Sequence, residues 1–405
     1  MSHFKEPVYP ILGDTRLEAG LTKGQTVSRS YASDVVVNDM GADGSYSTQA
    51  ITDTAETLTI NKEKEASIYI KKLDELQAHL SVKQKYGRKL ANAMINQIDG
   101  DVTLAAYNGA GTTMDDGTFS GTSGNAFTVT ASNVATVFTT AKQKLRLKNV
   151  IYNNRFQSSM DLEVPEGMPI AIVSPEILTY IELFLGGKDT LLGDQVSRNG
   201  FQGYFMGFNV FCVNTLPWTG VLSMVTQPSD GDTVTVNGVT FTFKTTLGST
   251  AGNVLIGGSA DAARANLAGL INTPGTTDSN GVALTAANQR LMKNLTATNS
   301  NSADTLTLVG SGWGTVVVSK SFTDPTDTWT STKQMLHCLF ALSKSVSVVI
   351  QKDPSLEDNS VSGKIGRDYI TWAAYGIKVF VDQAPQIVAL EVNSSSFTAA
   401  ATTQK

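Results

Sequence analysis

The stretch TLTINKEKEASIYIKKLDELQA (57–78) decides the fold, because it changes from strand periodicity to helix periodicity within one short segment. Apolar side chains alternate with polar ones at Leu58–Ile60 and again at Ile68–Ile70, on either side of the charged run Lys62-Glu63-Lys64-Glu65. Alternation with a period of two is typical of half-buried strands. We therefore predict an extended β-hairpin loop over 31–72 with the charged run at its tip.

A long helix follows directly, over about 73–107. Its apolar face is marked at steps of four residues by Leu90, Met94, Ile98 and Val102, which is the spacing of one helix face. At about 1.5 Å per residue such a helix is on the order of 50 Å long. That is more than a compact domain usually needs, so we expect it to act as a spine for the surrounding strands.

Two segments have too few apolar residues to be stable by themselves. Prolines and glycines interrupt residues 1–30, which we interpret as an N-terminal arm. The polar hairpin has the same deficit, and an isolated two-stranded hairpin is at best marginally stable in water. We predict that both pack against another subunit, with Lys62, Glu63, Lys64 and Glu65 as candidate interface residues. The alternative is a solvated turn, in which an exposed ion pair stabilises by at most about 1 kcal/mol.

Residues 226–330 differ in composition from the rest of the chain. They contain no Glu and no Tyr and are dense in Thr, Gly, Asn and Ser. Asn237-Gly238 lies between two alternating apolar runs, which favours a hairpin with a type I′ turn. A short helix is predicted from Ser259. We interpret 226–330 as an inserted β-rich domain.

The sequence offers no set of residues for catalysis or for a cofactor. The three histidines, His3, His79 and His337, are scattered, and neither HExxH, GxSxG nor a P-loop is present. Cys212 and Cys338 are flanked by apolar residues and lie outside any CxxC, so we expect reduced, mostly buried thiols. We predict no catalytic, cofactor-binding or metal site, and a protein that is not an enzyme.

Two pairs of carboxylates require a separate interpretation. Asp115-Asp116, and Asp324 with Asp327, lie in loops rich in Gly and Thr. Such carboxylates usually cap turns, although they are also the oxygen ligands that a hard cation prefers. We favour turns.

Charge and hydropathy exclude some partners. The formal net charge is −5, and the first thirty residues contain no basic arm, which argues against condensing nucleic acid by charge alone. No stretch is long enough to span a membrane, and no signal peptide is evident at the start. We expect synthesis in a reducing cytoplasm and no membrane partner.

The order of these elements resembles the major capsid proteins of tailed bacteriophages, whose fold is called Hong Kong 97-like. Residues 57–78 resemble the family's extended loop running into its spine helix, and RKLANAMINQIDGDV (88–102) resembles the end of that helix. MPIAIVSPEILTYI (168–181) resembles its strand-to-helix entry. GYFMGFNVFCVNTLP (203–217) and AAYGIKVFVDQAPQIVAL (373–390) resemble later stretches, the second its closing strands. Only 226–330 departs from the minimal pattern.

The resemblance implies an α+β chain in which discontinuous segments form the domains. We expect an arm, an extended loop, a spine helix, peripheral and axial domains, an insertion and a flexible tail. Their ranges are 1–30 for the arm, 31–72 for the loop, 73–167 with 372–395 for the peripheral domain, 168–225 with 331–371 for the axial domain, 226–330 for the insertion and 396–405 for the tail.

The resemblance also implies a function. The chain is expected to assemble with itself, as hexamers and pentamers, into an icosahedral head around double-stranded DNA. Portal, scaffolding or decoration proteins are further expected partners, and DNA is expected to be near the shell without sequence-specific contact. Assembly would take place in the bacterial cytoplasm and the product would be a virion. The alternatives are an encapsulin-like nanocompartment shell, which more often lacks an insertion, and a phage tail or adhesin protein, which poorly explains the spine helix.

Overall fold

The protein is described here from a computed structural model, and every statement on structure concerns the residues that it places. These are 7–17, 24–32, 35–40, 42–46, 48–50, 53–77, 82–148, 150, 167–187, 203–213, 216–311, 318–361 and 363–393. The predicted tail, 396–405, lies outside them. The fold is mixed α/β, as predicted.

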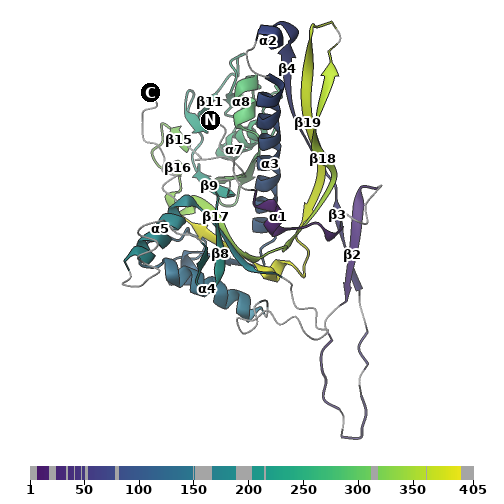
Figure 1. The fold of residues 1–405 in the computed structure, drawn as a ribbon. Helices are drawn as coiled ribbons and strands as arrows, with labels where there is room; N and C mark the ends of the chain where they lie inside the picture. Colours follow the sequence, from purple (N-terminus) through teal and green to yellow (C-terminus); the bar gives the residue numbers. More distant parts are fainter. Residues whose placement is uncertain are drawn as a thin grey trace. The chain divides into compact units, whose positions relative to one another are not determined.

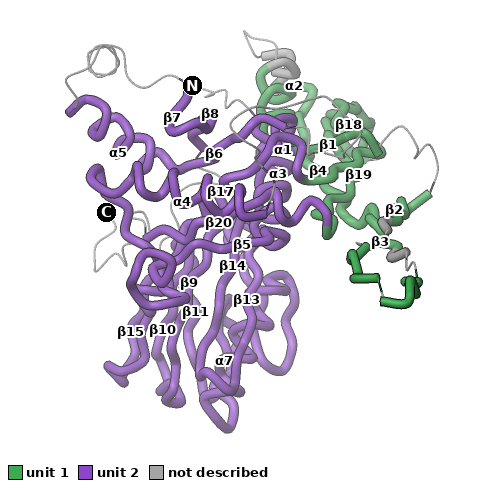
Figure 2. The backbone as a smooth tube through the Cα atoms, turned by 90° about the horizontal axis from the view of Figure 1, so that it is seen from below, with its two compact units in different colours: residues 1–6, 13–95, 346–381 green, residues 7–12, 96–345, 382–405 purple. Residues whose placement is uncertain are grey.

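The chain divides into two compact units, which Figure 2 distinguishes by colour. Unit 1 consists of residues 1–6, 13–95 and 346–381, and unit 2 of 7–12, 96–345 and 382–405. Both units are discontinuous in sequence. Their boundaries differ from the predicted ones, because the long helix is divided near its middle and residues 96–167 group with unit 2.

Unit 1 is built on a sheet of long strands, drawn side by side in Figure 1. The order is β1-β18-β19-β4. β18 and β19 are antiparallel neighbours, and β19 then pairs along the whole of β4. The bounds are Gly13–Asp14 for β1, Val346–Ser360 for β18, Gly366–Lys378 for β19 and Lys62–Lys71 for β4.

Two helices follow β4, namely α2 (Lys72–Gln77) and α3 (Val82–Asn108). The apolar face predicted for the long helix is confirmed, because Leu90, Met94, Ile98 and Val102 are all buried. In unit 1, Leu90 packs with Ile70 of β4 and Tyr369 of β19. The alternation of β4 therefore serves to place apolar side chains under the helix.

The charged run is not the tip of a hairpin, which corrects the prediction. β3 (Asp53–Thr59) pairs with β2 (Thr26–Ala32), from Thr59 opposite Thr26 to Asp53 opposite Ala32. Lys62–Glu65 instead begins β4 and pairs with Trp372–Tyr375 of β19. The hairpin therefore starts earlier than predicted, and its connecting segment is 33–52.

The N-terminal arm contains regular structure that was not predicted. α1 (Tyr9–Leu12) is a short helix in unit 2; its last residue, Leu12, and the preceding Val8 are buried. The carboxylate of Asp99, on α3, accepts hydrogen bonds from the backbone N–H of Val8 at 3.0 Å and of Tyr9 at 2.8 Å. Free N–H groups at a helix start need such an acceptor, so Asp99 holds this part of the arm in place.

Unit 2 contains a ten-stranded sheet. Its main path is β13-β14-β9-β17-β6-β8-β7, with β16 paired to β9, β20 paired to β17, and β5 paired to β20. The bounds are Leu295–Ser300 (β13), Thr305–Gly310 (β14), Trp218–Ser223 (β9), Met335–Leu342 (β17), Pro169–Val173 (β6), Phe208–Cys212 (β8), Tyr204–Phe205 (β7), Thr328–Trp329 (β16), Ile387–Val392 (β20) and Thr112–Met114 (β5).

Helices α4 (Val134–Leu147) and α5 (Pro175–Gly186) also belong to unit 2. Phe138 of α4 is fully buried and contacts Phe205 and Phe340 edge to face, each with ring centroids 4.9 Å apart. The predicted start of α5 is confirmed, because the Ser174 hydroxyl accepts from the N–H of Ile177 and Pro175 is the first helical residue.

The predicted insertion contains a small sheet of order β12-β11-β10-β15. The turn joining β10 to β11 has positive φ at both Asn237 (50°) and Gly238 (79°), which confirms the predicted Asn-Gly hairpin. The bounds are Thr233–Val236 (β10), Val239–Lys244 (β11), Asn253–Leu255 (β12), Val318–Ser321 (β15), Ala260–Asn272 (α7) and Ala286–Leu291 (α8).

The insertion shares its core with the strand that precedes it. β14 pairs with β9 from Thr305 opposite Ser223 to Gly310 opposite Trp218. Trp218, Leu222 and Met224, all before residue 226, are buried in the same cluster as the side chains of α7 and β10–β11. We call the structure from β9 to β16, which includes the predicted insertion, the inserted layer. This layer begins at β9 and not at residue 226.

This shared core predicts how fragments will fold. The isolated segment 226–330 should melt broadly, because it lacks β9 and the three buried side chains that precede it. A fragment of 216–330 should show one cooperative transition in differential scanning calorimetry. Equal, cooperative transitions in both fragments would show that β9 is dispensable and would restore the predicted boundary.

Candidate functional site

Among the described residues, the polar side chains form buried structural centres and exposed surfaces, with no group of three His, Cys, Asp or Glu arranged to hold a metal ion. No described helix has the length and apolar character needed to cross a bilayer. His3 and His79 lie outside the described residues. The two cysteines differ, since Cys338 is buried as predicted whereas Cys212 is exposed, which corrects the expectation for the latter.

The loop carboxylates form turns. Asp115 accepts from the N–H of Thr118 at 3.0 Å and thereby caps the short 3-10 helix Asp116–Phe119, with Thr118 completing a capping box. Asp327 accepts from the N–H groups of Val225 at 2.8 Å and Thr226 at 3.1 Å. The backbone groups thus engage these oxygens, as the turn interpretation predicted.

A buried polar centre surrounds His337 in unit 2. His337 is fully buried on β17, its Nε2 lies 2.7 Å from the Thr219 hydroxyl, and its ring stacks on Tyr107 with centroids 3.6 Å apart. Burial lowers the pKa of His337 to about 3. Glu391 lies directly opposite on β20, and its pKa is raised, chiefly by burial and then by the charge of Asp115.

Tyr107 connects these groups. Its hydroxyl lies 3.5 Å from a carboxylate oxygen of Glu391, at the limit of a hydrogen bond. Burial, followed by the charge of Glu391, raises the pKa of Tyr107 to about 12. At neutral pH the tyrosine and the histidine are therefore uncharged, and the centre joins α3, β17 and β20.

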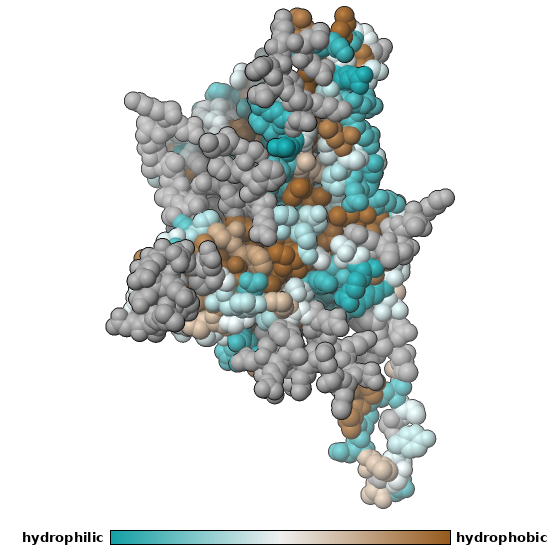
Figure 3. All heavy atoms as spheres, viewed as in Figure 1, coloured by the Kyte–Doolittle hydropathy of each residue, from teal (hydrophilic) through white to brown (hydrophobic). Residues whose placement is uncertain are grey.

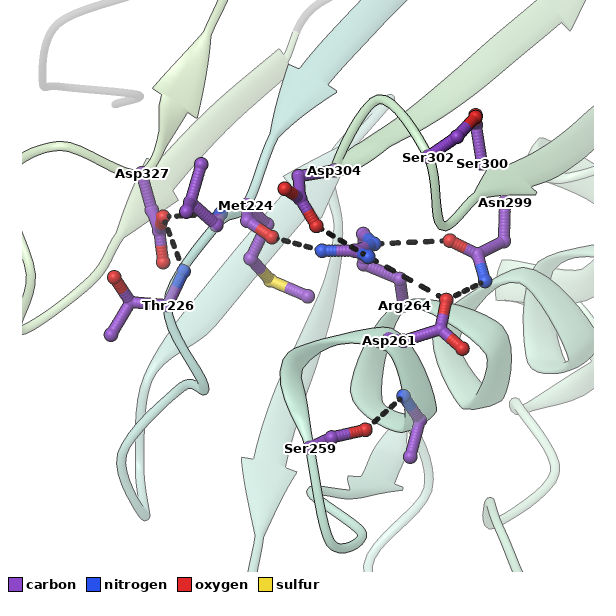
Figure 4. A network of polar contacts seen from close by, with 12 residues as sticks. Met224, Thr226, Ser259, Asp261, Arg264, Asn299, Ser300, Ser302, Asp304 and Asp327 are labelled. Carbon is purple, nitrogen blue, oxygen red and sulfur yellow. Dashed lines mark hydrogen bonds and ion pairs between the residues drawn. The ribbon is translucent and has the colours of Figure 1, made fainter.

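A second buried centre, in the inserted layer, is formed around Arg264 of α7 (Figure 4). The guanidinium is completely buried and donates to Asn299 at 3.0 Å, to Asp304 at 3.1 Å and to the backbone carbonyl of Met224. Asp261, one turn earlier on α7, lies 3.5 Å away. A planar guanidinium can hold several acceptors at fixed angles, so Arg264 ties α7 to β9 and to the β13–β14 turn.

The hairpin presents an exposed apolar surface, visible in brown at the lower end of Figure 3. Val35, Val36 and Val37 are 78%, 65% and 95% exposed, and Met40 and Tyr46 are 70% and 83% exposed. The valine run lies within the predicted hairpin, 31–72, but the structure assigns no strand to it. Contiguous exposed apolar side chains of this kind mark interaction surfaces.

The predicted interface residues divide between the two faces of β4. Glu63 and Glu65 are exposed, whereas Lys62 and Lys64 are half-buried on the face that also carries Ile68 and Ile70. Neighbours on β19 lie beside the two glutamates, with Ala374 opposite Glu63 and Trp372 opposite Glu65. The four residues therefore do not form one surface.

Comparison with known proteins identifies the fold. No family model and no curated protein sequence matches the chain. Among solved structures, one from Mycobacterium phage Che8 matches with a TM-score of 0.54 and 14% identity, covering 96% of this chain and 93% of that chain. The capsid structure of the Cyanophage P-SCSP1u matches with a TM-score of 0.51 and 13% identity, covering 98% and 91%. The chain thus shares its fold with a phage capsid structure over nearly its whole length.

Proposed function

We propose that the protein is the major capsid protein of a tailed bacteriophage, with a Hong Kong 97-like fold, and that it assembles into the icosahedral head around double-stranded DNA. The similarity to the P-SCSP1u capsid structure over 98% of the chain supports this proposal. On this proposal the role is structural and not enzymatic. The parts of unit 1 would form the peripheral domain, and the β17–β6–β8 region the axial domain.

The observation that carries the proposal is the hairpin of β2 and β3. Its connecting segment exposes Val35–Val37, Met40 and Tyr46 to solvent. Burying one such side chain stabilises by about 1.5–3 kcal/mol, and a two-stranded ladder needs a further surface. A neighbouring copy of the chain supplies that surface in a shell. The contact is repeated at each subunit, so that small contributions add.

The other expected partners follow from this role. Copies of the chain would form hexamers and pentamers, and portal, scaffolding or decoration proteins would join them during assembly in the host cytoplasm. The finished location would be the virion. The duplex DNA would be enclosed without being condensed by the charge of the shell, because the chain as a whole carries a net charge of −5.

Electron microscopy of the purified protein tests the proposal. We expect regular hollow shells from the native chain. Discrete monomers or small oligomers, or fibres of the kind a tail or adhesin protein would form, would contradict it. Shells that enclose a protein cargo and exclude DNA would favour an encapsulin-like nanocompartment instead.

Replacing Val35, Val36 and Val37 together by Ser should reduce the shell yield at least tenfold. Each contact between neighbouring subunits would lose the free energy of burying three valine side chains, which is about 1.5 kcal/mol or more for each valine. The circular dichroism spectrum of the unassembled subunit should be unchanged, because the three valines are exposed and do not belong to the buried core of the subunit. The matched control is Val225→Ser with Leu291→Ser, which removes exposed apolar side chains from the inserted layer. Equal yields of shells from both variants would refute the role of the hairpin.

The interface role of Lys62, Glu63, Lys64 and Glu65 remains a proposal, now centred on the exposed glutamates. Complementary charges at an interface select partner and register more than they add affinity. Glu63→Lys with Glu65→Lys should therefore lower the assembly rate at low salt without changing the melting temperature of the subunit. The neutral variant Glu63→Gln with Glu65→Gln should have an intermediate effect. Identical assembly rates for all three chains from low to high salt would show that the glutamates are only solvated.

A further inference from the structure

The first half of α3 carries an unusual concentration of positive charge. Residues 82–95 contain Lys83, Lys85, Arg88 and Lys89 and no Asp or Glu, in a chain whose net charge is −5. The nearest acid further along the helix is Asp99. This local excess is therefore not a reflection of the overall composition.

Three of these cations form one exposed surface. Lys85, Arg88 and Lys89 are exposed, and at 3.6 residues per turn they lie within an arc of about 100°. Leu90, on the opposite side of the helix, is buried. The ammonium groups of Lys85 and Lys89 each lie 5.9 Å from the ring centre of Tyr86. We call Lys85, Arg88 and Lys89 the basic face of α3.

The arrangement is unfavourable for the helix by itself. Positive charges near a helix start oppose the helix dipole, and like charges at i,i+3 and i,i+4 repel. The first turn of α3 contains no acidic residue to offset them. Among the ion pairs between described residues, none involves Lys85, Arg88 or Lys89. An external polyanion would neutralise the repulsion.

We propose that the basic face of α3 binds the phosphates of duplex DNA, an inference that rests on the proposed function because the head would enclose that ligand. Three cations along one turn can contact successive phosphates, and such contacts gain free energy by releasing condensed counterions without reading the sequence.

The competing partner is an acidic segment of a second copy. Residues 33–56, in the hairpin, contain five acids and no Lys or Arg, namely Asp34, Asp39, Asp43, Asp53 and Glu56. The hairpin, however, exposes apolar side chains at Val35–Val37, and a protein interface needs an apolar centre. Among the described side chains near the basic face, the apolar ones are the half-buried ring of Tyr86 and Leu356 of β18, which lies beside Gly87. The chemistry of the basic face therefore fits phosphates better than this hairpin.

The test is the salt dependence of binding to a fluorescent 24-base-pair duplex, measured by anisotropy with the unassembled full-length chain between 50 and 200 mM NaCl. In the variant Lys85→Gln, Arg88→Gln, Lys89→Gln, the slope of log K against log salt should become shallower by about 2.7, which is 0.9 for each of three phosphate contacts. The matched control Lys148→Gln, Arg290→Gln, Lys293→Gln also removes three exposed cations and should keep the native slope.

Two outcomes would overturn the proposal. One is an unchanged slope in the basic-face variant, or the same change in the control. The other is a variant that binds DNA normally but no longer forms shells in electron microscopy, which would assign the face to a second copy. Shells of the native chain test the proposed function separately, so that shells with an unchanged slope would refute only this inference.

Discussion

Arg264→Ala should lower the free energy of unfolding of the layer formed by β9–β16 by about 3 kcal/mol, because removing one partner from a buried charged network leaves the others unsatisfied. Arg264 is completely buried and donates to the Met224 carbonyl, to Asn299 and to Asp304. Asp304 and Asp261 are 45% and 39% exposed and can regain water, which limits the loss. The carbonyl of Met224, which lies within the apolar cluster, has less access to water.

Differential scanning calorimetry of the full chain and of the 216–330 fragment measures this effect. Arg264→Lys should recover only part of the stability, since an ammonium cannot reproduce the fork geometry of a guanidinium. Arg290→Ala, on the exposed end of α8, is the matched control and should change stability by less than about 0.5 kcal/mol. If Arg264→Ala and Arg290→Ala melt alike, the network does not stabilise the layer.

The features that the sequence predicted correctly are those fixed by neighbouring residues. The steps of four from Leu90 to Val102 define a buried helix face wherever the helix lies. Asn237-Gly238 can adopt positive φ at both positions, and Ser174-Pro175 combines a capping hydroxyl with a residue suited to the first helical turn. Each of these features is determined by residues within a short stretch of sequence, so periodicity and turn chemistry were sufficient to predict it.

The charged run shows where such reasoning fails. Alternation around Lys62–Glu65 correctly indicated extended chain, but alternation does not specify which strand lies beside it. The partner is Trp372–Tyr375, about 300 residues later, whereas the prediction paired the nearest strands in sequence. The chain passes from one sheet to another at Asn61 and does not form a hairpin turn there, because β3 pairs with the earlier strand β2 and β4 pairs with β19.

The two buried polar centres were also not predicted. Arg264 occupies the apolar face of α7 between Ala263 and Leu267, both fully buried. A cation at an apolar position of a helix indicates a buried polar contact, so the sequence contained a signal for this centre. His337 lies in the apolar run Leu336-His337-Cys338-Leu339, which indicates burial but not the contacts with Thr219 and Tyr107. Those partners come from segments over a hundred residues away, and only the fold brings them together.

Acid should destabilise the subunit through His337. An ordinary histidine has a pKa of about 6.5, whereas burial lowers the pKa of His337 to about 3. The unfolded chain therefore binds a proton that the folded chain does not. The stability linked to His337 is fully present above pH 6.5 and is lost as the pH falls from 6.5 toward 3. At up to 1.36 kcal/mol per pH unit, about 2.7 kcal/mol should disappear between pH 7.5 and 4.5.

The comparison with His337→Gln isolates this contribution, because an amide can still bond to the Thr219 hydroxyl but does not titrate. Urea unfolding of both chains at pH 7.5, 6.5, 5.5 and 4.5 should give a difference in stability that narrows by about 2.7 kcal/mol at the acid end. Glu391 acts in the opposite direction, since burial raises its pKa, but it is present in both chains and cancels. If the stabilities of the native and His337→Gln chains fall in parallel from pH 7.5 to 4.5, His337 titrates equally in the folded and unfolded states and the buried centre does not confer acid sensitivity.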